Sequence, residues 1–206
     1  TAAEVQDGKA PVASNLKRKE FVSGLEALAV ALDQVGGSMG SYFTTNTQKF
    51  RKAEARDFSQ AVAYREWLLD EVDLHAAKGF KEYVDESAWM GNLWTGWLLE
   101  FWTEVFIGLH NGIETKPSVD AAYEKTLAKH HNMLQRMAFF AGVRTLPNRL
   151  VIFDRLRGRS PQRAVAKAEI ATLIVLIRVL AQLCVDANTD IEALMSKRRV
   201  GVREKL

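Results

Sequence analysis

Residues 121–150 read AAYEKTLAKHHNMLQRMAFFAGVRTLPNRL and carry the strongest pattern in the chain. Four residues recur at spacings of three or four, as on one face of a single helix: Leu127, His131, Leu134 and Ala138. Ser118 or Asp120 is expected to cap this helix, and Pro147 is expected to end it. The pattern therefore places an imidazole, that of His131, on an otherwise apolar stripe.

Two interpretations of His131 are open on this pattern alone. A histidine on an apolar face is commonly a core residue whose ring nitrogen bonds to a neighbour. The other interpretation is a polar group held in an apolar pocket to recognise a ligand. His130 lies about 100° round the helix and is interpreted as an ordinary neighbour.

The composition is ordinary for a globular protein, with 206 residues, 48% hydrophobic residues and a net charge of +3. This length predicts a single domain over residues 15–206, preceded by a flexible arm over residues 1–14. The one cysteine, Cys184, lies in an apolar run and is expected to be a buried, inert thiol. No secretory signal pattern is visible, so a cytoplasmic location is expected.

Helical periodicity predicts an all-α fold of about eight helices, because no segment has the alternation typical of a strand. The expected helices cover residues 16–35, 41–55, 58–77, 87–109, the opening stretch, 146–157 and 161–186, with a last helix that Thr189 or Asp190 caps and that ends near Lys197. Three glycines between residues 36 and 40 are expected to break the first helix from the second.

The segment 87–109 is apolar nearly all round and holds four of the 5 tryptophans. It is long enough to cross a bilayer, but Glu100 and Glu104 in its second half argue against a membrane span. Such a helix is either a central core helix or the wall of an apolar cavity.

The sequence lacks the patterns of the common catalytic and metal sites. No HExxH motif occurs, and adjacent histidines on one helix cannot both point at one ion. The GGSMG string at residues 36–40 matches GxSxG in letters, but it follows a predicted helix and not a strand, so it is not interpreted as a nucleophile elbow. We therefore expect no enzymatic activity, no metal and no cofactor. The basic run at residues 196–205 is separate from the tryptophans, so nucleic-acid binding is not expected. That run is interpreted as a solvated tail or as a contact to an anionic membrane.

The opening stretch resembles the glycolipid transfer protein family. The family pattern of Ala-Tyr, a Leu, a fixed His and a later Leu-Pro is matched by Ala122-Tyr123, Leu127, His131 and Leu146-Pro147. Upstream, NLWTGWLLEF is similar to the family helix with a lipid-stacking Trp, and NTQKF is similar to its Asn-x-x-Lys segment. The resemblance covers most of the chain in the right order.

This resemblance implies a two-layer helical sandwich that encloses an apolar lipid pocket and holds one sphingolipid. Its partners would be a sphingolipid or glycolipid and a transient membrane surface, and the protein would act as a monomeric carrier without catalysis. It further implies that His131 bonds the ceramide amide region and that Trp94, or else Trp97, stacks on a sugar. Asn46 and Lys49 would then bond the sugar hydroxyls.

The chain departs from the family at one polar contact. The family places an Asp four residues before the Asn, whereas this chain has Tyr42 there. No Lys or Arg lies between residues 82 and 115, although phosphate-binding relatives carry basic residues on this helix. The head group is therefore expected to be uncharged. Two alternatives are a lipid sensor that has lost efficient transfer and a helical interaction module without a ligand.

Overall fold

The computed structural model describes residues 16–36, 39–78, 87–158 and 162–198. Within them the chain forms eight α-helices and one 3-10 turn, and the one β-bridge joins Lys17 to Ala63. The elements are α1 (Arg18–Val35), α2 (Met39–Ala55), α3 (Tyr64–Ala77), α4 (Ala88–His110), α5 (Thr115–Lys125), η1 (Ala128–His130), α6 (Met133–Val143), α7 (Arg149–Leu156) and α8 (Arg163–Arg198). The predicted all-α class is confirmed. The predicted N-terminal arm and most of the basic run lie outside the described residues.

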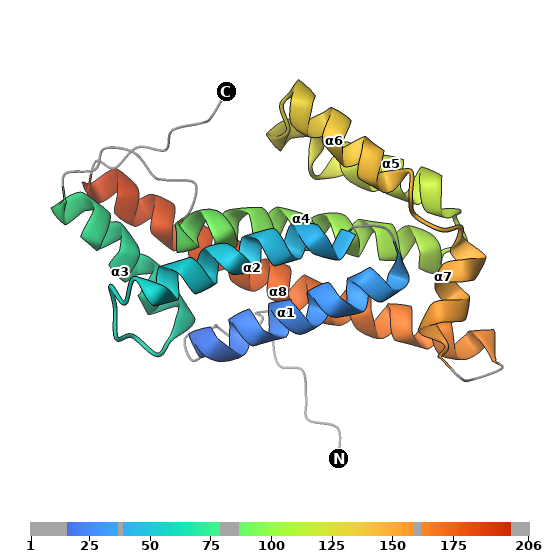
Figure 1. Cartoon of the computed structure of the whole chain (residues 1–206), viewed down its shortest axis with the longest axis horizontal. Coiled ribbons are helices and arrows are strands. Elements are labelled where there is room, and N and C mark those ends of the chain that lie inside the picture. The colour runs from blue at the N-terminus through green and yellow to red at the C-terminus, as the bar shows by residue number, and fades with distance from the viewer. Residues whose placement is uncertain (1–15, 37–38, 79–86, 159–161, 199–206) are drawn as a thin grey trace, which may run out of the picture.

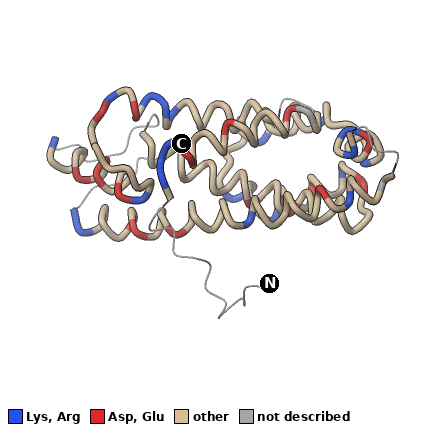
Figure 2. Tube along the Cα trace, turned by 90° about the horizontal axis from the view of Figure 1, so that it is seen from below, with Lys and Arg blue, Asp and Glu red and all other residues tan. Residues whose placement is uncertain are grey.

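The helices form two layers (Figures 1 and 2). Helices α1 and α2 pack against each other, and α2 lies on α4, which pairs along its length with α8. Helix α3 packs on one part of α8 and α7 on another, while α5 lies against α4 (Figure 1). Helix α4 therefore contacts most of the fold, as expected for a helix that is apolar nearly all round.

The core interpretation applies to most of α4, whereas its role as a cavity wall stays a prediction. Trp89 and Trp102 are completely enclosed and belong to the core, together with Phe101 and Phe106. Trp94 and Trp97 are only half-buried and lie at the edge of the core. Trp89 and Trp102 therefore serve the packing of the core, whereas the half-buried Trp94 and Trp97 are the ones placed to form a site.

A buried polar network fixes how α4 sits between its neighbours. The Asn92 amide nitrogen donates to the Cys184 carbonyl at 3.0 Å and to the Asn188 side-chain oxygen at 2.8 Å. The Asn92 side-chain oxygen accepts from the Tyr64 hydroxyl at 2.8 Å. Since Asn92 is fully buried and both of its donors are used, the network joins α3, α4 and α8 without an unpaired amide.

A second buried group closes the start of α4. The Glu71 carboxylate accepts from the backbone N–H groups of Ala88 and Trp89, each at 3.0 Å, and pairs with Arg56 at 3.1 Å. The first N–H groups of a helix have no partner within it, and a carboxylate there is favoured by the helix dipole. Burial still raises the pKa of Glu71 above its usual value.

The opening stretch does not form one helix, and this prediction is wrong. Helix α5 begins earlier, at Thr115, and ends at Lys125, while α6 begins only at Met133. Leu134, which was expected on the apolar face, is 75% exposed. The reason is a new helix start at Asn132, whose side chain caps α6.

Two other boundaries also differ from the sequence prediction. Helix α8 is continuous, with no break at Thr189, and the Thr189 hydroxyl bonds back to the Val185 carbonyl within the helix instead of capping a new one. Asp190 pairs with Arg65 of α3 and does not act as a cap. Helix α3 starts at Tyr64 and not near residue 58, because the backbone of residues 62–64 hydrogen-bonds to the chain just before and at the start of α1.

One face of α8 is left uncovered. By length and composition alone, Ala164–Arg198 passes as a membrane span, and only 22% of its most apolar window is buried. The other face packs on α3, α4 and α7, and Cys184 on it is fully enclosed, as expected for an inert thiol. The helix thus belongs to the sandwich while exposing Val175, Leu176 and Val179.

The Asn92 network gives a stability prediction. Asn92→Leu is expected to lower the free energy of unfolding by about 3 kcal/mol, because three buried partners lose their hydrogen bonds. Urea denaturation followed by circular dichroism measures the change. Asn111→Ala, at the exposed end of α4, is the matched control and should change stability by less than about 0.5 kcal/mol. Equal effects of the two variants would contradict a central role for the network.

Candidate functional site

The site is built around the break between α5 and α6. The Asn132 side chain accepts from the Gln135 backbone N–H at 2.9 Å, and the Gln135 side chain accepts from the Asn132 N–H at 2.9 Å. This reciprocal capping box starts α6 and keeps the preceding residue out of the helix. His131 is therefore extended, with φ −99° and ψ 128°, and not on a helical stripe.

Three aromatic rings surround the His131 imidazole. Its Nδ1 lies 3.1 Å from the Tyr123 hydroxyl, which is hydrogen-bond distance. The rings of Trp94 and Phe139 each have their centroid 5.7 Å from that of His131. The bond to Tyr123 fixes one ring nitrogen, and the other, Nε2, has no hydrogen-bond partner among the described residues. Burial lowers the pKa of His131, with a smaller contribution from Arg136, so the ring is neutral near pH 7.

His130 is also part of this cluster, although the sequence pattern made it an ordinary neighbour. Its ring stacks on Trp97 with centroids 3.5 Å apart and 10° between the planes. Its Nε2 is buried and has no hydrogen-bond partner among the described residues. Burial, with Lys129 and His131 nearby, lowers the pKa of His130 to about 4. Two neutral imidazoles therefore stand side by side.

The two candidate tryptophans play different parts in the cluster. Trp97 meets Trp94 edge to face, with centroids 4.9 Å apart and planes 80° apart. One face of Trp97 is covered by His130, whereas Trp94 meets the tilted ring of His131. Trp94 is thus the better placed of the two to offer a flat surface to a ligand.

Asn46 and Lys49 of α2 pack against α4 close to Gly91. A Cβ atom on Gly91 would lie only 3.3 Å from the Asn46 carbonyl oxygen and from Lys49 Cβ, so the two helices meet closely there. Gly91 lies one turn before Trp94 on α4. The Asn46 amide nitrogen donates to the Tyr42 carbonyl at 3.0 Å, and Asn46 is buried. Asn46 and Lys49 therefore lie against α4 one turn before Trp94.

Tyr42 replaces the expected carboxylate with a ring that reaches α6. Its ring centroid is 6.3 Å from that of Phe139, and its hydroxyl lies 3.2 Å from where a Cβ on Gly142 would be. Burial raises the pKa of Tyr42, so the hydroxyl stays protonated. Tyr42 thus fills the space between α2 and α6 without bringing a negative charge to the cluster.

A cleft of about 470 Å³ opens beside the cluster, between α4, the end of α5 and α8. It holds Lys129 and Arg178, and also Glu100 and Glu104, the latter paired with Lys125 at 2.8 Å. The cleft is therefore lined by basic and acidic side chains together. Within the described part of the chain, no three His, Cys, Asp or Glu side chains gather to hold a metal ion.

A capping-box signal in the sequence explains why the predicted single helix is broken before α6. Asn132 and Gln135 have the N-cap to N3 spacing of a capping box, and this signal competes with the apolar period that runs through Leu127 and Leu134. Once α6 is started at Asn132, both histidines fall in the link between helices. The contact of His130 with Trp97 depends on tertiary packing and has no such signal.

Similar folds occur among solved structures. Mouse ceramide-1-phosphate transfer protein in its apo form superposes with a TM-score of 0.65 at 17% identity, over 87% of this chain and 89% of that chain. The human ceramide-1-phosphate transfer protein, in complex with 12:0 ceramide-1-phosphate, gives 0.67 at 16% identity over the same shares. A structure described as showing how FAPP2 selects simple glycosphingolipids using the GLTP-fold gives 0.62 at 17% identity, over 89% of this chain and 87% of that chain.

The all-helical sandwich of this chain is the GLTP fold of these solved structures. The family described as Glycolipid transfer protein (GLTP) matches residues 16–158. The chain therefore belongs to the glycolipid transfer protein family, as its resemblance predicted. No curated protein matches the chain.

The neutral histidines predict a pH dependence of stability. In the folded protein the pKa of His130 is about 4, while an unfolded histidine titrates near 6.5, so the unfolded state binds more protons between these values. Stability should therefore fall as the pH is lowered from 6.5 to 4.

The loss caused by His130 is expected to be on the order of 1 kcal/mol once its partial exposure to solvent is allowed for. Urea unfolding at pH 7 and pH 4.5 measures this loss. His130→Phe, which keeps the stack on Trp97, should lose less stability over that range than the wild type, and an equal loss would contradict the assignment.

Proposed function

We propose that this protein binds one sphingolipid with an uncharged head group and carries it between membranes in the cytosol, as a monomer and without catalysis. The observation that carries the proposal is the His131 and Trp94 pair in a chain of the glycolipid transfer protein family. His131 Nε2 bonds the amide region of the lipid, and the free face of Trp94 stacks on the head group. Asn46 and Lys49 bond polar groups of the head from the side of α2.

The charges around the cluster support an uncharged head group. A phosphate is usually neutralised by Arg or Lys, and α4 has neither. Both histidines are neutral near pH 7 because burial lowers their pKa values. In the neighbouring cleft, Glu100 and Glu104 offset most of the positive charge of Lys125, Lys129 and Arg178, and Lys125 already pairs with Glu104. A hydroxyl-rich head gains hydrogen bonds here without a desolvated charge.

The hydrocarbon chains would enter the apolar interior below His131. Leu127, Phe101 and Phe139 are buried next to the cluster and form its floor. Each methylene that leaves water contributes roughly 0.8 kcal/mol, so a chain can displace side chains that pack less well around it. In this proposal the lipid-free interior opens as the chain enters, which is the behaviour of a cryptic pocket.

Helix α6 offers a membrane contact beside the site. Met133, Leu134 and Met137 lie on its outer side and are 80%, 75% and 61% exposed. Large exposed apolar residues that gather on one helix commonly mark an interaction surface. Since α6 starts directly after His131, a membrane bound there would place the lipid next to the aromatic cluster. Arg136 on the same helix suits an anionic bilayer surface.

The deciding experiment is a vesicle transfer assay with fluorescent glycosphingolipid, ceramide-1-phosphate and phosphatidylcholine in turn. Accelerated transfer of the glycosphingolipid alone supports the proposal, and acceleration of none of the three rejects transfer. Lipid extraction and mass spectrometry of the purified protein then separate a sensor, which holds a lipid without transferring it, from a ligand-free helical module. Tyr42 in place of the family carboxylate makes the sensor the main competing function.

His131→Ala is expected to weaken glycosphingolipid binding by about 1–3 kcal/mol, because the amide region of the lipid loses a partner inside an apolar site. Trp94→Ala should weaken binding more than Trp97→Ala, since His130 covers Trp97. Tryptophan fluorescence titration with the lipid measures both effects. An unchanged affinity in His131→Ala would show that His131 is structural, and a larger loss in Trp97→Ala would assign the stacking to Trp97.

Leu134→Gln with Met137→Gln is expected to lower binding to anionic vesicles roughly tenfold, because about 1–2 kcal/mol of apolar contact is lost. Vesicle sedimentation measures binding, and lipid affinity in detergent solution should stay unchanged. Val30→Gln, which changes a similarly exposed residue on α1, is the control. A loss of the same size in the control would show that the α6 surface is not specific.

A further inference from the structure

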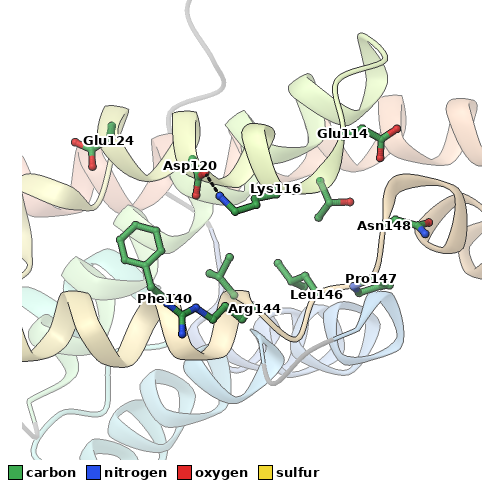
Figure 3. Close-up of a pocket in the computed structure, with 11 residues that line it drawn as sticks. Glu114, Lys116, Asp120, Glu124, Phe140, Arg144, Leu146, Pro147 and Asn148 are labelled. Carbon is green, nitrogen blue, oxygen red and sulfur yellow. Dashed lines mark hydrogen bonds and ion pairs between the residues drawn. The ribbon is translucent and has the colours of Figure 1, made fainter.

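A separate groove lies between α5 and the chain that runs from α6 into α7 (Figure 3). It encloses about 700 Å³, which is within the usual range for small-molecule sites. One wall is apolar and is formed by Phe140, Val143, Leu146 and Pro147. The other wall is polar and belongs to α5. The groove is thus amphipathic across its width.

One contact between two rings, Phe140 and Tyr123, separates the groove from the histidine cluster. Phe140 lines the groove, and its centroid is 4.8 Å from that of Tyr123. Tyr123 in turn holds His131 through its hydroxyl. None of the residues predicted for the lipid head group lines the groove. A ligand in the groove would therefore occupy a second site.

One buried hydroxyl in this groove has no partner. Thr115 lines the groove and is 5% exposed, and its Oγ1 makes no hydrogen bond to any described residue. Among the other buried threonines, Thr103 and Thr126 each donate to a backbone carbonyl four residues earlier at 2.8 Å, whereas Thr95, inside α4, is also unpaired and lies outside the groove. Leaving a buried hydroxyl unpaired is costly. Oγ1 itself is enclosed, so a ligand hydroxyl would pair with it after the Thr115 side chain rotates towards the groove.

The charges of the groove cancel. Glu114, Asp120 and Glu124 oppose Lys116 and Arg144, and Lys116 already pairs with Asp120 at 3.0 Å. The N-termini of α5 and α7 also border the groove, and each end acts as roughly half a positive charge. Together these terms leave the groove close to neutral. A charged ligand head would be desolvated there without a matching counter-charge, whereas an uncharged polar head would not.

We propose that this groove binds a single-chain lipid with an uncharged, hydroxyl-bearing head, of the monoacylglycerol class. The head lies at the Glu114 and Asn148 end, where its hydroxyl bonds Thr115 Oγ1. The chain runs over Leu146 and Pro147 towards Phe140, in the direction that Figure 3 shows. Burial of the chain supplies the affinity, and the hydroxyl pair supplies the preference for the head.

The test uses three ligands that share one chain and differ in the head: 1-monolauroylglycerol, lauric acid and dodecylamine. Isothermal titration below the critical micelle concentration is expected to give the tightest binding for the monoacylglycerol. Thr115→Val removes the hydroxyl at nearly constant shape and should weaken that binding roughly 5- to 30-fold. Thr115→Ser should restore most of it. The matched control is Thr103→Val, which changes an equally buried threonine outside the groove and should leave the affinity unchanged.

Two further measurements keep the proposal open to refutation. Thr115→Val should not lower the melting temperature of the lipid-free protein, because no hydrogen bond is lost. Leu146→Asn, in the apolar wall, should weaken the monoacylglycerol as well, and His131→Ala should not. Equal or tighter binding of the acid or the amine, no binding of the monoacylglycerol, or an unchanged affinity in Thr115→Val would each overturn the proposal.

Discussion

The arrangement of the site depends on the rotation of α4, and that rotation is fixed by Asn92. Its amide bonds groups from α3 and α8 in a fully buried position, so turning the helix would leave three polar groups unpaired. At about 100° per residue, Trp94 and Trp97 lie roughly 140–200° round from Asn92. The same bonds that hold the core together therefore turn two tryptophans to its edge.

A second local constraint brings the histidines to those tryptophans. The capping box at Asn132 and Gln135 satisfies two backbone N–H groups and so makes residue 132 a helix start. A helix that continued through His131 would lose these bonds and would turn one histidine away from α4. With the break, His130 and His131 are both placed against the tryptophans, one stacked on Trp97 and one facing Trp94.

The sequence was enough to predict the helices whose signals agree. Apolar period, length and breakers point the same way for α1, α2 and α4, and these elements lie within a few residues of the prediction. The errors occur where two signals conflict. In the opening stretch the apolar period predicts one helix, whereas the capping box predicts a new start, and the structure follows the capping box. At Thr189 the sequence predicts a helix cap, but the hydroxyl bonds within the helix. The choice between such signals is made by tertiary contacts.

The family resemblance, more than the pattern, pointed to the contact between His131 and Trp94, and the binding roles of these residues stay predictions. His131 and Trp94 do come together, yet the argument that put His131 on an apolar helical stripe was wrong in its geometry. His130 was missed because its partner, Trp97, is more than thirty residues away in the sequence and no local rule links them. Packing between distant segments decides which of two adjacent histidines covers which ring.

A carrier has to release what it binds, and the chemistry of this cluster is consistent with that requirement. Hydrogen bonds to charged groups are about twice as strong as those between neutral groups, and ion pairs in a dry site are hard to break. Here burial keeps both imidazoles uncharged, and Tyr42 brings a protonated hydroxyl where the family has a carboxylate. In the proposed function, affinity would then come mainly from the hydrocarbon chain, which a membrane can also accept. The polar groups of the cluster would set the selectivity. A lipid without the matching hydroxyl or amide would bind more weakly, because it would leave buried nitrogens unpaired.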